Sequence, residues 1–69
     1  MRLDNMNGTI RENIKPGLRV NIVQKKDQAT QNLTQGIVAD ILTNSPEHPR
    51  GIKVRLATGE IGRVKNVIT

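Results

Sequence analysis

The chain contains no Phe, Trp or Tyr. Their absence excludes the usual form of several binding domains. Readers of proline-rich peptides need grooves lined by aromatic rings, readers of methyl-lysine need aromatic cages, and cold-shock or RNP-type proteins stack bases on exposed rings. Nucleic-acid binding by this chain would therefore depend on phosphate contacts, backbone amides and the flat guanidinium groups of arginine.

Cysteine is also missing, which excludes disulfides, thiolate catalysis and cysteine-based zinc sites. No apolar run approaches the roughly 18 residues of a membrane span, and Met1–Asp4 lacks the hydrophobic region of a signal peptide. We therefore expect a cytoplasmic protein. Ile, Leu and Val supply 19 of the 69 residues, which suffices for a thin aliphatic core and a stability of about 3–5 kcal/mol.

Positive charge is concentrated in the C-terminal third of the chain. The formal net charge is +5 and the pI is about 10.5. Five of the 11 basic residues lie between Arg50 and Lys65, where Glu60 is the one acidic residue, whereas the first 49 residues hold six basic and five acidic groups. Such a field indicates an anionic partner, above all nucleic acid, although a solvated face that keeps a protein soluble has the same composition.

Short segments that alternate between apolar and polar residues predict an all-β protein. Asn and Gly in residues 1–8 favour a flexible N-terminal arm, with residues 9–69 as one domain. Lys15-Pro16-Gly17 has the composition of a turn. We expect strands at residues 18–23, 33–42, 51–57 and 60–68, with the polar segment 24–32 as a mobile loop. Four to five short antiparallel strands favour a small SH3-like β-barrel, because closure removes exposed strand edges.

The predicted strand 33–42 has apolar residues on both sides. Ile37, Ala39 and Ile41 share one face, and Val38 lies on the other. This pattern predicts burial on more than one side. Asp40 is then either a buried acid or, as the simpler interpretation, a residue at a sheet edge or paired with a basic side chain.

The last two predicted strands alternate apolar and cationic residues around a turn at Thr58-Gly59. We expect Leu56 to face Ile61 across the turn on the core side. A β-bulge at Gly62 then sets Val54 opposite Val64, Arg55 opposite Arg63, and Lys53 opposite Lys65. All four cations then share the outer face, where like charges in opposition cost stability and so suggest a function. The candidate nucleic-acid-binding residues are Lys53, Arg55, Arg63 and Lys65, extended by Arg50, Lys25 and Lys26.

The lone histidine, His48, lies between Pro46 and Pro49. General acid–base chemistry needs an oriented partner and a pocket, and a metal needs further ligands beside it. The chain shows no convergent set of acid, base and nucleophile, and so small a domain rarely encloses a pocket of a few hundred Å³. We expect no catalytic residue, no metal, no cofactor and no enzyme activity. His48 is interpreted as a loop residue whose ring bonds the backbone or packs on a proline.

Two resemblances bear on the fold. Ile14-Lys15-Pro16-Gly17-Leu18, followed later by Gly36-Ile37-Val38, resembles SH3-like small barrels of the KOW type, many of which belong to ribosomes or transcription complexes. Nearly the whole chain resembles the YwbE-like family of small bacterial and archaeal proteins, through residues 8–14, 27–28, 33–38, 41–45, 48–56 and 59–64. The most specific marker is His48-Pro49-Arg50-Gly51-Ile52-Lys53-Val54. The family resemblance implies a small β-barrel and no established activity.

Two functions are consistent with these features. The first is a non-enzymatic module that binds structured RNA through phosphates with weak sequence preference. A ribosome-associated assembly is one setting in which such a module would act. The alternative is a protein–protein interaction module, in which the loop 43–50, stiffened by two prolines, presents His48 and Arg50 to a partner.

Overall fold

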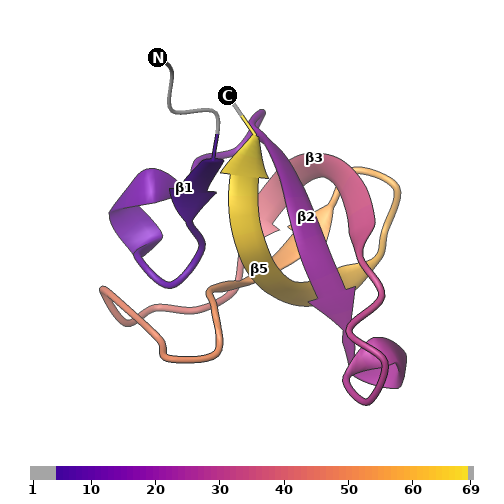
Figure 1. Ribbon diagram of the computed structural model, residues 1–69. Helices are drawn as coiled ribbons and strands as arrows, with labels where there is room; N and C mark the ends of the chain where they lie inside the picture. The colour runs from indigo at the N-terminus through magenta and orange to yellow at the C-terminus, as the bar shows by residue number, and fades with distance from the viewer. Residues whose placement is uncertain (1–4, 69) are drawn as a thin grey trace.

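Five antiparallel strands and two short 3-10 helices make up residues 5–68, which are the residues that this computed structural model describes (Figure 1). In chain order the elements are β1 (Asn5–Asn7), η1 (Arg11–Asn13), β2 (Arg19–Gln24), η2 (Lys25–Asp27), β3 (Thr34–Ile41), β4 (Lys53–Leu56) and β5 (Ile61–Ile68). The prediction of an all-β small barrel is confirmed. Each of the four strands predicted from the alternation is present, and its ends differ from the prediction by no more than two residues.

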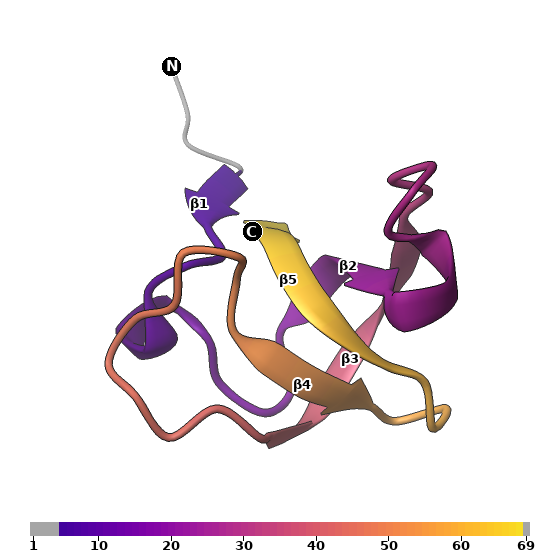
Figure 2. The ribbon, with the colours of Figure 1, turned by 90° about the horizontal axis from the view of Figure 1, so that it is seen from below.

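The long strand β5 closes the barrel. The strand order is β1-β5-β2-β3-β4, and β5 also pairs with β4. On one side β5 pairs with β2, and on its other side it pairs first with β4, through residues 61–63, and then with β1, through residues 66–68. Figures 1 and 2 show β5 curving past β2 and β4 on the way to the end of the barrel where both termini lie.

Aliphatic side chains from β2–β5 and from the adjoining segments fill the barrel. β4 alternates strictly, with Val54 and Leu56 buried and Lys53 and Arg55 exposed, as expected for a strand with one face in a core. The core consists of Ile14, Val20, Ile22, Val38, Ile52, Val54, Leu56, Val64 and Val67. Burial of each such side chain is worth about 1.5–3 kcal/mol against exposure, so this small set accounts for the cohesion of the barrel.

The N-terminal segment differs from the predicted flexible arm. Residues 1–4 lie outside the described residues, but Asn5–Asn7 forms β1 against β5. Gly8 is buried, and its carbonyl oxygen accepts a hydrogen bond of 2.8 Å from the Ile52 amide. Asn and Gly have low intrinsic preference for strands. The pairing is set instead by the edge of β5 beyond β4, which offers backbone groups to a partner.

The strand β3 is buried on one side only, and it contains a β-bulge. The register with β4 shifts between Val38 and Asp40, so Ala39 is the extra residue. Val38 is 2% exposed and lies in the core, whereas Ile37 is 37% exposed, and Ala39 is exposed as well. The predicted burial of Ile37 and Ala39 is therefore wrong. Val38 takes the core side and Ile37 the outer side, and the bulge at Ala39 then leaves Asp40 exposed and brings Ile41 against the core.

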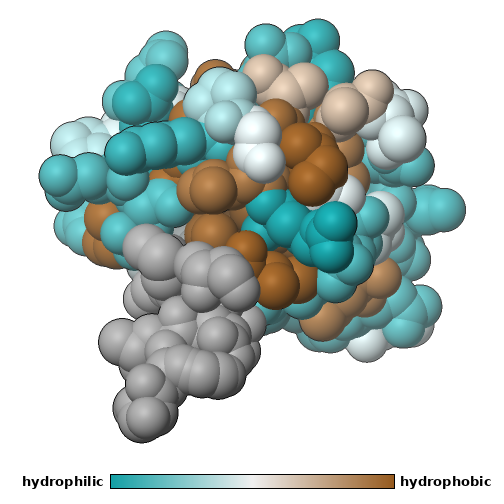
Figure 3. Space-filling model, turned by 90° about the horizontal axis from the view of Figure 1, so that it is seen from above, coloured by the Kyte–Doolittle hydropathy of each residue, from teal (hydrophilic) through white to brown (hydrophobic). Residues whose placement is uncertain are grey.

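The barrel surface is mixed in character. In the view of Figure 3, hydrophobic side chains lie near the middle of the described part of the face, with hydrophilic ones among them and along much of the outline. Among the described residues the large exposed hydrophobic side chains are Leu33, Ile37 and Ile61. Within residues 5–68 no helix has the length and apolar character needed to cross a membrane.

Candidate nucleic-acid interface

The β4–β5 hairpin carries the predicted cations, although its register differs from the prediction. The Cα partners are Lys53 with Arg63, Val54 with Gly62, and Arg55 with Ile61. The hairpin therefore has no bulge at Gly62, and the predicted opposition of Arg55 with Arg63 and of Lys53 with Lys65 is wrong. The assumption that Ile61 faces the core caused the error, since Ile61 is 43% exposed and Gly62 takes the buried position.

The predicted shared face nevertheless exists. Lys53 and Arg63 are paired across the two strands, and Arg55 follows Lys53 by two residues, so all three lie on the outer side of the hairpin. Arg63 is half-buried, and its Nη1 donates a hydrogen bond of 3.3 Å to the Gly51 carbonyl oxygen. This bond holds the guanidinium near the loop that precedes β4.

Lys65 lies two residues after Arg63, on the same side of β5, and it is the extra residue of a bulge in that strand. In the pairing with β2, Ile22 is opposite Val64 and Asn21 is opposite Asn66, which leaves Lys65 as the extra residue. Lys65 is exposed, while Val64 before it is buried. The strand β5 thus contains a bulge, but it lies at Lys65 rather than at Gly62, and in the ladder with β2 rather than in the one with β4.

Arg55 differs from the other cations of the hairpin because it forms an ion pair with Asp40. Its Nη1 lies 3.5 Å from Oδ2 of Asp40, and both side chains are about half exposed. Asp40 is also the Cα partner of Arg55 in the β3–β4 ladder, which confirms the interpretation of Asp40 as an acid paired with a basic residue. Since a carboxylate already compensates its charge, Arg55 contributes less to an anion site than Lys53, Arg63 or Lys65.

An open cleft of about 380 Å³ joins three cations to two carboxamides. The lining comes from three parts of the chain, which are the end of β2 with the turn after it, the loop between β3 and β4, and β5. The described residues that line the cleft are Val23, Gln28, Gln31, Pro49, Arg50, Arg63 and Lys65, and none of these is acidic. The geometry therefore produces a concave, positively charged site with neutral hydrogen-bonding groups on one wall.

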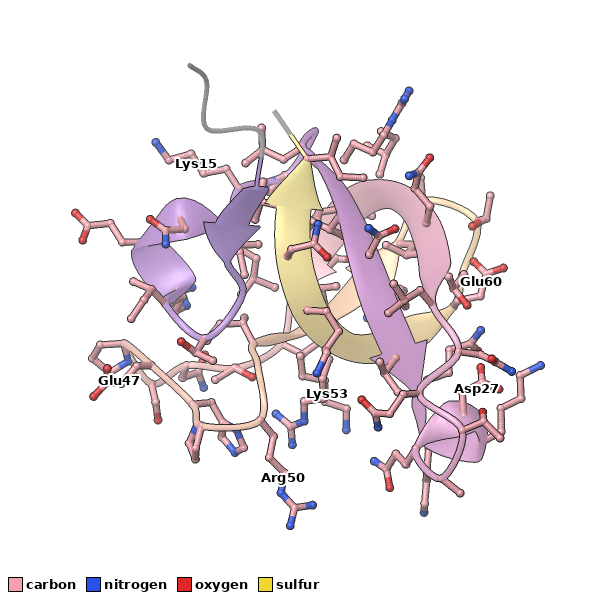
Figure 4. The ribbon with its side chains drawn as sticks, viewed as in Figure 1. Lys15, Asp27, Glu47, Arg50, Lys53 and Glu60 are labelled. Atoms are coloured by element: carbon pink, nitrogen blue, oxygen red, sulfur yellow. The ribbon has the colours of Figure 1, made fainter. Side chains whose placement is uncertain are left out.

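Arg50 and Lys53 project on the same side of the barrel, below it in the view of Figure 4. Lys15 lies at the other end of the molecule in that view. The labelled acidic side chains Glu47, Asp27 and Glu60 lie toward the flanks of the barrel. The cationic side is thus spatially distinct, in agreement with the uneven charge distribution along the chain.

The polar segment after β2 is more ordered than the predicted mobile loop implies. It begins with η2, and the Gln31 amide then donates a hydrogen bond of 2.6 Å to the Asp27 carbonyl oxygen. Gln31 has a φ of 62°, the left-handed conformation that favours glycine. Its Nε2 also donates to the Gln28 carbonyl oxygen at 2.7 Å. These bonds hold the turn that brings Gln28 and Gln31 to the cleft.

Lys25 and Lys26, predicted to extend the basic surface, lie on η2 and are exposed. Neither belongs to the cleft lining. The pKa of Glu60 in the β4–β5 turn is lowered chiefly by a hydrogen bond from Thr58, and the positive charge of Lys26 acts in the same direction. The predicted extension of the basic surface by these two lysines thus lies outside the cleft itself.

His48 bonds to the backbone, as interpreted from the sequence. Its Nδ1 accepts a hydrogen bond of 3.1 Å from the Arg50 amide. The loop is tied to the N-terminal segment, since the His48 amide donates to the Thr9 carbonyl oxygen at 2.9 Å and the Arg11 amide donates to the Pro46 carbonyl oxygen at 2.8 Å. The same contacts fix the backbone that carries Arg50 into the cleft.

Comparisons with known proteins identify relatives of the whole domain. Residues 7–67 match the family DUF2196, described as an uncharacterized conserved protein. The chain belongs to this family. The family match is supported by the uncharacterized protein YwbE of Bacillus subtilis (strain 168), which is 55% identical over 64 residues, 93% of this chain and 98% of YwbE. No solved structure matches the chain. The predicted resemblance to the YwbE-like family is therefore confirmed.

This member of the DUF2196 family contains two functional candidates that sequence reasoning did not include. Gln31 and Pro49 line the cleft, and Gln28, which belongs to the predicted polar loop 24–32, lines it as well. Isolated glutamines in a polar stretch have no distinctive pattern, so only the fold brings them together. The cleft reaches a few hundred Å³, but it is open to solvent rather than enclosed. Within residues 5–68 no group of three His, Cys, Asp or Glu side chains is placed to hold a metal ion.

Proposed function

We propose that this protein is a non-enzymatic, cytoplasmic RNA-binding module that holds structured RNA by its phosphates on the outer face of β4 and β5. The observation that carries the proposal is the convergence of Arg50, Arg63 and Lys65 on one cleft, with Lys53 paired to Arg63 at its border. A ribosome-associated assembly, where structured RNA is abundant, is a setting that suits such a module.

Phosphate groups match the chemistry of this surface. Guanidinium groups bind phosphate oxygens through paired N–H donors, and lysine ammonium groups add point charges. The strands β4 and β5 keep Lys53 and Arg63 on one side, so these two cations are already adjacent before RNA binds. A duplex or hairpin offers phosphates at regular spacing to such a surface, whereas an extended single strand would lack aromatic rings to stack on.

Salt dependence tests the mechanism. Four phosphate contacts, from Arg50, Lys53, Arg63 and Lys65, would release counterions so that log K falls with log salt at a slope of about −3. We would titrate isotope-labelled protein with structured RNA hairpins at two salt concentrations and follow the amide shifts by NMR. Salt-sensitive shifts at these four residues support the proposal. Absence of shifts at low salt, or affinity that does not change with salt, contradicts it.

A protein-interaction role is the second candidate, and the anchored loop 43–50 favours it. A second cavity of about 240 Å³ is lined by Thr9, Glu47, His48 and Pro49. A substitution of Arg50 would not distinguish the two functions, because Arg50 belongs to the loop 43–50 and also lines the basic cleft. The informative variant is His48→Ala, which should abolish a protein pull-down in this second case. The double variant Lys53→Glu with Lys65→Glu should then leave the pull-down intact, whereas it should remove RNA binding in the first case.

A further inference from the structure

We infer that the cleft receives one unpaired nucleotide of a structured RNA, with its phosphate at Arg63 and Lys65 and its base beside Gln28 and Gln31. This inference rests on the proposed RNA-binding function and specifies which RNA feature is recognised. It goes beyond contact with a phosphate backbone, because it assigns a role to the neutral wall of the cleft.

The size and shape of the cleft suit a ligand as small as one nucleotide. Its volume of about 380 Å³ lies near the lower end of the roughly 300–1,000 Å³ that is common for small-molecule sites. A double helix is far too wide to enter such a cleft and can only lie across its mouth. A single nucleotide displaced from a helix can enter while the neighbouring phosphates remain on the outer face, near Lys53.

The lining divides into a charged part and a neutral part. Arg50, Arg63 and Lys65 are cationic, whereas the segment 28–31 contributes two carboxamides. A carboxamide has both a donor and an acceptor, which is the combination that the edge of a base presents. Phosphate therefore has partners in one part of the cleft and a base edge has partners in the other.

The carboxamide of Gln31 is held in place before a ligand arrives. Its Nε2 donates to the Gln28 carbonyl oxygen at 2.7 Å, and its backbone is fixed by the 2.6 Å bond to Asp27. The Oε1 atom of Gln31 is left as an acceptor for a base amino group. The exposed side chain of Gln28 can offer either a donor or an acceptor.

Flat or apolar groups in the cleft substitute for the missing aromatic rings. Val23 and Pro49 supply apolar surface, and Arg50 supplies a planar guanidinium. Bases that are unpaired in RNA loops and bulges stack on arginine planes as well as on aromatic rings. The nucleobase can thus be enclosed without Phe, Trp or Tyr.

Two RNA hairpins with identical stems test the inference, one of them carrying a single bulged nucleotide. We expect wild-type protein to bind the bulged hairpin about tenfold more tightly, the effect of one stacked and hydrogen-bonded base. The double variant Gln28→Ala with Gln31→Gly should reduce this preference to less than about twofold. Glycine is chosen at position 31 because it suits the φ of 62°.

The outcomes separate this inference from the proposed function. Equal affinity of wild-type protein for both hairpins would overturn the inference while leaving the phosphate-binding function in place. If neither hairpin binds at low salt, both are overturned. Gln35→Ala is the matched control, since Gln35 is exposed on β3 and outside the cleft lining, and it should keep the full preference.

Discussion

Lys53 lies directly opposite Arg63 in the β4–β5 ladder, on the outer face of the barrel. Like charges in direct opposition destabilise a strand pair by a few tenths of a kcal/mol up to about 1 kcal/mol. The free protein therefore carries an unfavourable contact that a bound anion would turn into a favourable one. A substitution of Lys53 can therefore change the free energy of unfolding and the RNA affinity in opposite directions.

Lys53→Glu should stabilise the protein and weaken RNA binding at the same time. A carboxylate opposite Arg63 replaces repulsion by attraction, which should raise the free energy of unfolding by about 0.5 kcal/mol. The slope of log K against log salt should become shallower by about 1 because one phosphate contact is lost. Urea denaturation and salt-dependent titration measure the two effects.

Lys15→Glu is the control for this change in charge. Lys15 is exposed and lies at the other end of the barrel from Lys53 (Figure 4). The Lys15→Glu substitution makes the same change in net charge as Lys53→Glu, and it should lower RNA affinity much less. Equal losses of affinity in the two variants would show that net charge alone, and not the outer face of β4 and β5, governs binding.

Arg55→Gln should affect RNA binding less than Arg63→Gln. Arg55 is paired with Asp40 at 3.5 Å, whereas Arg63 lines the cleft and bonds the Gly51 carbonyl oxygen. Loss of the exposed Arg55–Asp40 pair should cost no more than about 1 kcal/mol of stability. Affinity measured at one salt concentration ranks the two variants, and a larger loss for Arg55→Gln would contradict the placement of the site.

Gly51→Ala should destabilise the barrel far more than Gly17→Ala. Both glycines have a positive φ, +103° at Gly51 and +96° at Gly17, so alanine costs about 1–2 kcal/mol of backbone strain at either position. At Gly51 the added Cβ would also lie 2.3 Å from the Val64 carbonyl oxygen, while at Gly17 nothing lies within 4 Å.

The clash at Gly51 should add about 1–3 kcal/mol to the strain. Because Gly51 immediately precedes the buried Ile52 and lies beside β5, this total approaches the whole stability expected for a domain of this size. Thermal unfolding followed by circular dichroism compares the two variants. Similar melting temperatures would contradict the close approach of Gly51 to β5.

Glu60 should make a small contribution to stability that is lost in acid. The hydroxyl of Thr58 donates a hydrogen bond to Oε1 of Glu60. This bond lowers the pKa of the carboxyl group below its ordinary value of 4.5, and the Glu60 amide and the charge of Lys26 act in the same direction. The stabilisation is therefore complete above pH 4.5 and decreases as the pH falls through the lowered pKa.

Thr58→Val tests this account of the β4–β5 turn. Without the hydroxyl, the pKa of Glu60 should return toward 4.5, and the difference in stability between neutral and acidic solution should shrink. NMR titration of the Glu60 side chain gives the pKa directly. An unchanged pKa in the variant would assign the shift to the backbone amide or to Lys26 instead.

Local alternation was sufficient to predict most of the barrel. The segment containing Lys53, Val54, Arg55 and Leu56 behaves as an ideal strand with one buried face, so its exposed cations were predicted correctly. Such features depend on residues that are close together in the sequence.

Features that depend on distant partners were not predictable. Ala39 and Lys65 are bulged residues, and nothing in the alternation marks them, because a bulge is set by the twist of the whole sheet. Ile61 was assigned to the core since it is apolar, but Gly62 fills that position with its backbone close to Val23. The cleft likewise joins residues from three separate segments of the chain.

The central position of β5 gives the two sides of the cleft different freedom to move. Arg63 and Lys65 belong to the strand that pairs with β1, β2 and β4, so their backbone can be released only when the barrel opens as a cooperative unit. Gln28 and Gln31 belong to a surface turn held by a few local bonds, which can open by itself. A phosphate would thus meet charges whose backbone is fixed by the whole barrel, whereas a base would meet carboxamides whose positions depend on local bonds within one turn.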